Sequence, residues 1–400
     1  MNSQMFAAIV AGFTTLLTVA GLGYYLIALW SARSFLRRSR FSAGFAPPVS
    51  ILKPLHGLDP GMLDAFASHC RQNYPGDYEL LFGVSRLDDP AAIVRQLQVD
   101  FPNRAIRLIQ TPEVLGPNGK VSNLAQIVPH ANFDYLIFND SDIRVGPNYL
   151  AHVMAPFAAR DGQKPVGLVT ALYRGRAHRT LGSKLEALGI STDFAPGVLT
   201  SRFLERGIHF GLGSTLAVSR RALEAVGGLV PFAEYLADDY ELGAHIARAG
   251  FGVELANEIV ETHVPEWTFS GYLHHQLRWA RAMRDSRRGG YAGLLFSYGL
   301  AWSILNLVAS GLSLPAFALF SLALMFRVSL ALGVGVGILG DRQVLRDLWL
   351  LPLRDLLALA IWAWSYASDA IAWRDERFVL KNGRLIKRET VSEGRLAKDV

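Results

Sequence analysis

Cysteine is almost absent from the sequence, which contains only Cys70 among its 400 residues. A single cysteine excludes an intrachain disulfide and a cysteine-based zinc site, so nothing indicates an oxidising compartment. Charged residues are also scarce at 18%, whereas hydrophobic residues make up 51%. Because this composition is too apolar for an ordinary soluble protein and too charged for a pure bundle of membrane helices, we predict a soluble domain joined to membrane segments.

The sequence also lacks the marks of a nucleic-acid-binding protein, although its net charge is +6. It has no zinc-ligand pattern, no aromatic RNA-binding signature and no isolated basic domain. Its arginines cluster beside apolar stretches, in residues 33–40 and 284–288. We therefore expect the bilayer as a partner, through anionic lipid headgroups, and no nucleic acid.

Residues 1–32 are predicted to form an N-terminal transmembrane anchor, because residues 5–30 carry no charge and about 20 helical residues span the hydrocarbon core. A cleaved signal peptide is the alternative, but no basic segment precedes the apolar run, which is long for such a signal. The arginines of residues 33–40 follow at once. By the positive-inside rule, they place the next domain in the cytosol.

A second membrane region is predicted in residues 291–373. It contains two candidate spans, at 294–314 and 316–339, and a third apolar stretch, at 348–373, that charged residues interrupt. We place the basic tail of residues 374–400 in the cytosol, which requires an even number of crossings after the soluble domain. We therefore favour two full spans, with the third stretch re-entrant or lying in the interface. The predicted location is a bacterial inner membrane or, in a eukaryote, the Golgi membrane.

Residues 47–290 are predicted to form the cytosolic α/β domain, including an interfacial helix. Short apolar runs, typical of buried strands, occur at residues 49–52, 80–84, 106–109, 135–138, 167–170 and 214–218. Segments with helical spacing, at residues 62–70 and 91–99, separate the first three runs. Strands that alternate with helices indicate a mostly parallel sheet with ligands at the carboxyl ends of its strands.

Two aspartates, Asp140 and Asp142, follow the apolar run at residues 135–138 and should lie at the carboxyl end of a strand. A D-x-D motif there lets carboxylates bind a divalent cation, Mg²⁺ or Mn²⁺, that bridges a nucleotide diphosphate and stabilises it as a leaving group. A solvated turn after a strand is the alternative.

A second acidic cluster lies between Glu234 and Glu241, just before the helical run at residues 242–249. Helix capping explains one of its aspartates. Either Asp238 or Asp239 could also act as the base that takes the proton of an acceptor hydroxyl during an inverting sugar transfer.

Asp89 and Lys120 are further candidates for nucleotide-sugar binding. Asp89 follows the second predicted strand and could accept a hydrogen bond from uracil or ribose, although a helix N-cap before Pro90 suits it as well. Lys120 precedes a helical stretch and could reach a diphosphate with help from helix N-terminal amides. An ordinary solvated lysine is the alternative.

A basic motif lies between the soluble domain and the predicted spans, with the sequence His275-Gln276-Leu277-Arg278-Trp279. His275 and Arg278 are three residues apart and share a helix face. Arg278 can offer a forked donor to a phosphate, and Trp279 can stack on a sugar or lie at the interface. The alternative is a basic amphipathic helix on the membrane surface.

Taken in order, these motifs resemble the ceramide glucosyltransferase family, glycosyltransferase family 21, and the similar bacterial hopanoid-associated glycosyltransferases. The likeness includes VSILKPLHGLDP at residues 49–60 and the Lys120-x-x-Asn123-Leu124 pattern, and it extends to about residue 380. It implies a GT-A type fold and a hexosyltransferase that moves glucose, with inversion, from UDP-glucose to the hydroxyl of ceramide. Transfer of N-acetylglucosamine to a hopanoid is the alternative, followed by a processive polysaccharide synthase and a non-catalytic membrane scaffold.

The resemblance also assigns roles to the matching positions. It implies that Asp89 contacts the uridine, that Asp140 and Asp142 bind the metal and the diphosphate, that Asp239 is the general base, and that Arg278 and Trp279 hold the diphosphate or the acceptor.

Two positions depart from the family pattern. His275 stands where Gln or Arg is usual, and because the charge of a histidine depends on pH, a contact to the diphosphate would depend on pH too. Asp142 completes a full D-x-D where some relatives have only the first aspartate, which supports the metal site.

Overall fold

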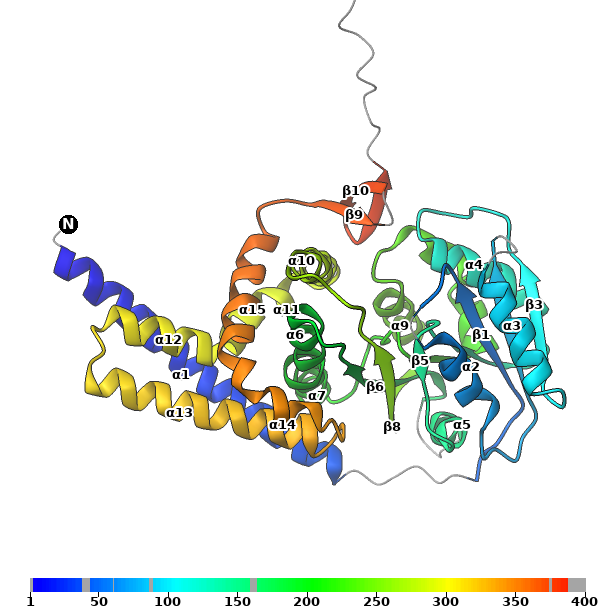
Figure 1. Cartoon of the computed structure of the whole chain (residues 1–400), viewed down its shortest axis with the longest axis horizontal. Helices are drawn as coiled ribbons and strands as arrows, with labels where there is room; N and C mark the ends of the chain where they lie inside the picture. The colour runs from blue at the N-terminus through cyan, green and yellow to red at the C-terminus, as the bar shows by residue number, and fades with distance from the viewer. Residues whose placement is uncertain are drawn as a thin grey trace, which may run out of the picture.

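A computed structural model describes residues 3–37, 44–59, 61–85, 89–158, 164–373 and 376–387. Figure 1 shows an α/β part and a bundle of long helices that extends from one side of it. The mixed architecture that the composition predicts is therefore present.

The α/β part is built on an eight-stranded sheet in the order β3-β2-β1-β4-β7-β6-β8-β5. Its first four strands are parallel, as the alternation of strands and helices predicts. Neighbouring residues of β1, such as Ile51 and Leu52, point to opposite faces and are both fully buried, so both faces of the sheet are covered. These strands are β1 (Val49–Leu55), β2 (Tyr78–Val84), β3 (Ala105–Gln110) and β4 (Tyr135–Phe138).

The second half of the sheet is mixed. β7 (Leu216–Ser219) runs antiparallel to β4 and to β6 (Val166–Arg176), whereas β6 and β8 (Gly252–His263) are parallel. The short strand β5 (Ile143–Arg144) completes the edge beside β8. The predicted α/β fold with a mostly parallel sheet is confirmed, but the sequence does not predict β8, because polar residues interrupt its apolar positions.

Short helices cover the sheet, and two of them start at residues that the sequence singles out. α4 begins after Asn118, whose side chain caps the helix by accepting from the amides of Lys120 and Val121. α9 begins at Asp238. The covering helices are α2 (Met62–Cys70), α3 (Asp89–Asp100), α4 (Gly119–Ile127), α5 (Tyr149–Met154), α8 (Arg220–Ala225) and α9 (Asp238–Arg248).

A second group of helices lies between the sheet and the long helices (Figure 1). α6 (Leu181–Gly189) continues through a π-helical turn at Ile190–Phe194 into α7 (Ala195–Leu204). α10 (Phe269–Ser286) packs on α6 and on α15 (Leu351–Ser365), and α6 also packs on β6. This group therefore connects the sheet to the long helices.

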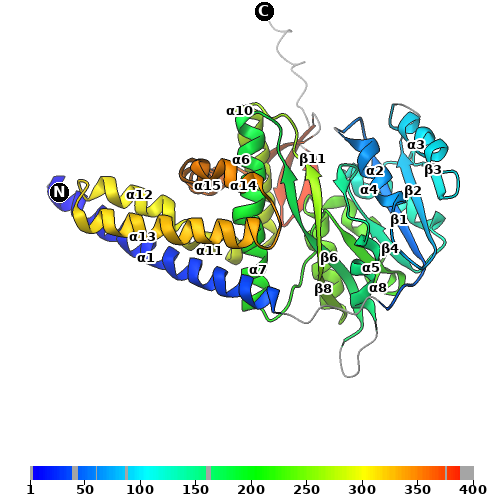
Figure 2. The same cartoon turned by 60° about the horizontal axis from the view of Figure 1, so that its bottom comes forward.

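Two helices are long and apolar enough to cross a membrane. They are residues 4–36 of α1 (Ser3–Leu36) and residues 314–336, which are α13 (Leu314–Leu330) and its π-helical continuation. A third crossing results if α11 (Arg288–Gly293) with residues 294–297 forms one span with α12 (Gly299–Ala309), which it meets at 52°. α1, α12 and α13 lie side by side (Figures 1 and 2), and α15 crosses their direction in Figure 1. The chain is a membrane protein, and its described residues hold two or three candidate crossings.

α1 and α12 approach each other closely at a pair of glycines. A Cβ on Gly21 would overlap the Cα of Gly299. Small residues at such contacts are typical of membrane helices, which associate through close packing and hydrogen bonds. Asn306 adds to this contact, because its side-chain amide donates to Thr15 Oγ1 at 2.7 Å and to the Ala11 carbonyl at 2.9 Å.

Arg327, the charge inside α13, faces protein, which avoids the cost of a bare charge in the bilayer. Its guanidinium donates to both carboxylate oxygens of Asp355 at 2.8 Å and to Asp193 at 2.8 Å. Asp355 belongs to α15, and Asp193 belongs to the π-helical turn before α7. One arginine thus ties α13 to α15 and to the helices next to the sheet.

The last described residues form a three-stranded antiparallel sheet of β9 (Ala370–Trp373), β10 (Glu376–Lys381) and β11 (Arg384–Lys387). Its second turn packs against the segment before α9, where the Leu236 amide donates to the Gly383 carbonyl at 3.2 Å. Residues 376–387 of the predicted basic tail are therefore folded, and they lie beside the second acidic cluster.

Candidate active site

The D-x-D motif follows β4 and is held by neighbouring strands. Lys53 of β1 is fully buried, and its Nζ donates to the backbone carbonyl of Asp140 at 3.0 Å. Burial lowers the pKa of Lys53 to about 7, although the charges of Asp142 and Asp140 oppose this shift. On the β8 side, the hydroxyl of Thr262 donates to Asp142. Lys53 lies within the opening segment that carries the family resemblance, but nothing in its spacing predicts this contact.

Asp140 and Asp239 face one shared space beside Gly213. A methyl group on Gly213 would lie 3.1 Å from Asp239 Oδ2 and 3.7 Å from Asp140 Oδ2. The other carboxylate oxygen of Asp239 accepts from the Tyr240 amide at 2.8 Å, in the first turn of α9. The fold therefore brings the D-x-D motif and the second acidic cluster together, although they lie far apart in the sequence.

Lys120 joins the two acidic clusters from the start of α4. Its Nζ lies 2.8 Å from Asp140 Oδ1 and 3.6 Å from Asp238 Oδ2. Burial opposes the charge of Lys120, but the charges of Asp140, Asp238 and Asp239 outweigh burial and hold its pKa above the ordinary value. The N-cap Asn118 fixes the same region, because its side-chain amide donates to Asp238 Oδ1 at 3.2 Å. Lys120 is thus a permanent cation in contact with both clusters.

Two carboxyl groups of this site, those of Asp239 and Asp142, have raised pKa values. Burial and then the charge of Asp238 raise the pKa of Asp239 to about 6, against the opposing effect of Lys120. Burial and then the charge of Asp140 raise the pKa of Asp142 to about 6, against the hydrogen bond from Thr262. Carboxylates with such raised pKa values are candidates for proton transfer and for binding a cation that relieves their repulsion.

Asp140 and Asp142 offer the oxygen ligands that hard divalent cations prefer. Among the described residues, no group of three or more His, Cys, Asp or Glu side chains is arranged to hold a metal ion. A cation at the D-x-D motif would therefore need further oxygens, and Mg²⁺ commonly binds through one or two carboxylates together with substrate phosphates. The residues present fit a metal that binds with its nucleotide substrate.

The predicted basic motif lies on α10, where an aromatic stack and a buried acid hold His275. The ring of His275 stacks on Trp267, with centroids 4.9 Å apart, and makes a tilted contact with Trp279, with centroids 5.1 Å apart. Its Nδ1 is 3.0 Å from Glu186 Oε2 of α6. Arg278 is half-buried on the same helix. His275 and Trp279 thus form one unit, which Glu186 orients.

Tyr173 and Glu186 lie near the candidate site, and the motifs do not reveal them. Tyr173 is buried on β6, and burial raises the pKa of its phenol, followed by the charges of Asp239, Glu186, Asp140 and Asp142. Its hydroxyl therefore lies in the field of both the acidic clusters and the Glu186–His275 pair. From the sequence alone, a tyrosine in a buried strand is expected to be an ordinary core residue. Only the fold shows that Tyr173 lies near the acidic clusters.

Asp89, the predicted uridine contact, is the first residue of α3, but its side chain lies outside the described residues. The neighbouring Asp88 also lies outside them.

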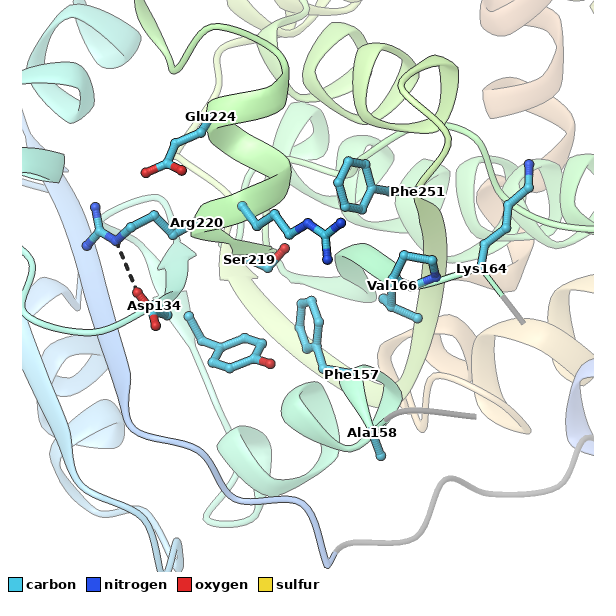
Figure 3. A pocket seen from close by; sticks show the side chains of 12 residues that line it. Asp134, Phe157, Ala158, Lys164, Val166, Ser219, Arg220, Glu224 and Phe251 are labelled. Carbon is cyan, nitrogen blue, oxygen red and sulfur yellow. Dashed lines mark ion pairs between the residues drawn. The ribbon is translucent and has the colours of Figure 1, made fainter. Parts of the chain in front are cut away.

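A cavity of about 520 Å³ lies away from these acidic clusters, near the amino ends of β4 and β6 (Figure 3). Tyr135 and Val166, the first residues of these strands, line it, and its Arg220 forms an ion pair with Asp134 at 3.5 Å. Ligands of open α/β sheets bind at the opposite, carboxyl ends of the strands. This cavity therefore takes no part in the candidate active site.

Comparison with known proteins gives one family. A family model described as glycosyl transferase family 21 matches residues 13–386. Ceramide glucosyltransferase 3 of Caenorhabditis elegans is 23% identical over 276 residues, which cover 67% of this chain and 59% of that protein. Ceramide glucosyltransferase 1 of the same organism is 24% identical over 236 residues, which cover 59% of this chain and 49% of that protein. The matched regions thus span between half and three-fifths of these relatives' length.

A solved structure shares the fold. It is a mannosyltransferase from Pyrobaculum calidifontis in complex with GDP-Man and Mn²⁺, with a TM-score of 0.56 at 18% identity. The match covers 90% of this chain and 98% of that one. Together with the family match, it confirms the predicted GT-A type architecture.

Proposed function

The chain belongs to glycosyl transferase family 21, and on this basis we propose that it is an inverting hexosyltransferase that moves a sugar from a UDP-sugar donor to the hydroxyl of a membrane lipid. Glucose is the proposed sugar and ceramide the proposed acceptor. The observation that carries the proposal is the shared space beside Gly213, which Asp140 and Asp239 both border. The transfer needs one carboxylate that binds the cation of the diphosphate leaving group. It needs a second carboxylate close by that accepts the proton of the acceptor hydroxyl.

In the proposed reaction, Asp239 is the general base. Its pKa of about 6 leaves it ionised at neutral pH and basic enough to accept a proton from the lipid hydroxyl. As that proton moves to Asp239, the hydroxyl oxygen attacks the anomeric carbon of the sugar, and the bond to the UDP oxygen breaks on the opposite face. The configuration at the anomeric carbon is therefore inverted.

The remaining residues of the site bind the donor. When bound, a divalent cation at Asp140 and Asp142 would supply positive charge to the departing diphosphate. Lys120, which contacts Asp140 Oδ1, can turn from that carboxylate to a diphosphate oxygen. Asp89 is assigned to the uridine, and His275, Arg278 and Trp279 are assigned to the diphosphate or the acceptor.

We place the reaction at the cytosolic surface of the membrane. The arginines after α1 orient the sheet domain toward the cytosol by the positive-inside rule. α15 crosses the direction of α1 and α13, which suits a helix lying in the interface (Figure 1). α6 and α10 lie between that helix and the sheet, so they would receive the lipid acceptor at the membrane surface.

The test is a parallel transfer assay in membranes that contain the expressed protein. Labelled UDP-glucose and UDP-N-acetylglucosamine are supplied separately, with ceramide added, and the labelled lipid is identified by mass spectrometry. We expect one glucose on ceramide. A labelled hopanoid would replace both donor and acceptor assignments, a ladder of sugars would indicate a processive synthase, and no transfer from either donor would refute the proposal.

A further inference from the structure

The end of α7 carries an arginine in a conformation that favours glycine. α7 ends at Leu204, and Arg206 follows with φ of 56°, in the left-handed region. The Gly207 amide then donates to the Arg202 carbonyl at 3.0 Å and closes the helix end. Glycine is the usual residue at this position, because side chains are strained there. A long side chain held against this preference indicates a role for the side chain itself.

Arg206 lines a pocket of about 340 Å³ between α1, α7 and the start of β8. Ser34 lines it from α1, Arg202 and Phe203 from α7, and Glu254 from β8. Arg206 makes no ion pair with any residue that the structure describes. Of the neighbouring acids, Glu205 is engaged by Arg287, and Glu254, which lines the pocket, has an interaction partner as well. The pocket thus places the exposed guanidinium of Arg206 among polar side chains and the apolar residues Phe203, Ile208 and Val253.

The pocket lies at the basic end of a helix that is able to cross a membrane. Arg33 lies in the last turn of α1 and Arg37 follows its last residue, and both are exposed, as is Leu36 at 63%. On α7, Leu204 is 62% exposed. α1 packs along α7 (Figure 2), and Arg202 of α7 lies over the ring of Phe35 near the end of α1, 5.7 Å from its centroid. The ends of the two helices therefore bring these apolar residues and arginines near one another. Apolar side chains next to arginines match the layer in which acyl chains meet lipid phosphates.

We propose that this pocket binds the phosphate headgroup of an anionic membrane phospholipid, with Arg206 as the principal ligand. A guanidinium forms two parallel hydrogen bonds with a phosphate, and Leu36 and Leu204 would contact the acyl chains. Compensation of the α7 dipole is the simpler explanation for a cation here. Arg202 already supplies that charge from the last turn without a strained backbone, so the dipole leaves the position of Arg206 unexplained.

The test uses the full-length protein in a neutral detergent and measures thermal unfolding with increasing short-chain phosphatidylglycerol. A ligand that binds only the folded protein raises Tm with its concentration. We expect this rise for the wild-type protein, and an apparent affinity weaker by about tenfold or more in Arg206→Gly. Arg206→Gly suits the left-handed backbone, so its Tm without lipid should not fall. Arg206→Asn, which also tolerates this backbone, is a second variant.

Three controls decide the interpretation. Arg95→Gln removes the same charge from an exposed position of α3 and should keep the wild-type response. Phosphatidylcholine of equal chain length should give no comparable rise. Inorganic phosphate and glycerol phosphate distinguish a lipid site from a site for free phosphate. A full response to phosphatidylglycerol in both Arg206 variants would overturn the proposal, as would an equal response of the wild-type protein to phosphatidylcholine or to free phosphate.

Discussion

Replacing Gly213 with alanine tests the proposed active site without removing a charge. The added methyl group would lie 3.1 Å from Asp239 Oδ2, closer than ordinary van der Waals contact, and 3.7 Å from Asp140 Oδ2. Gly213 has no positive φ, so alanine is compatible with the backbone. The substitution therefore changes the space between the two carboxylates and leaves the fold in place.

The expected effect is larger on turnover than on stability. Asp239 must move by a few tenths of an ångström, and a misplacement of about 1 Å can cost about 100-fold in rate. We therefore expect kcat for sugar transfer to fall by about tenfold, which corresponds to about 1.4 kcal/mol of transition-state free energy. Because alanine reduces the conformational entropy of the unfolded chain, the free energy of unfolding should change by less than about 1 kcal/mol.

The assay compares initial rates of labelled sugar transfer and thermal unfolding for matched variants. Gly197→Ala is the control, because a methyl group on Gly197, in α7, would meet no atom within 4 Å. It should keep wild-type turnover and gain up to about 1 kcal/mol of stability. Wild-type kcat in Gly213→Ala would show that no reacting group occupies the space between Asp140 and Asp239, and the reasoning would fail.

Four further predictions concern the base, the metal and the buried arginine. Asp239→Asn should abolish transfer while UDP-sugar binding, measured by calorimetry, stays within about threefold, and retained turnover would exclude Asp239 as the base. Because a base must be unprotonated and burial raises the pKa of Asp239 to about 6, kcat of the wild-type enzyme should fall as the pH drops through about 6, and a flat profile from pH 8 to 5 would contradict this role. EDTA should stop the reaction and excess Mg²⁺ or Mn²⁺ restore it, so full activity in EDTA would remove the metal from the mechanism. Arg327→Met should lower the free energy of unfolding by about 3–5 kcal/mol, because it leaves the buried Asp355 without its ion pair, and an unchanged Tm would show that this pair contributes little.

The local elements of the site are predictable, because each follows a short-range rule. Asp140 follows a buried strand, and Asp238 and Asp239 precede a helical run. The sequence therefore places the first acidic cluster at the end of a strand and the second at the start of a helix. That they meet depends on the pairing of β4 with β7, which brings the Gly213 loop to the end of β4. Antiparallel pairing between strands so far apart in the sequence leaves no local signal.

The sequence does not predict the contacts of the buried polar side chains, and it does not predict the strands β10 and β11. Glu186 lies in an apolar helix and finds its partner, His275, on another helix. Lys53 lies in a strand that reads as fully buried, where a charged side chain is unexpected until its contact to the Asp140 carbonyl is known. β10 and β11 lie in a segment that the sequence predicts only as a basic cytosolic tail. Their packing against the segment before α9 becomes visible only in the fold.

The contact between Gly383 and Leu236 has a consequence for any shortened version of the protein. The Leu236 amide, two residues before Asp238, donates a backbone hydrogen bond to the Gly383 carbonyl in the turn between β10 and β11. Removing residues 376–387 would keep the eight-stranded sheet and the long helices, but it would take this support away from the segment that leads into α9. A shortened protein made for study should therefore keep β10 and β11, so that the acidic cluster retains its position.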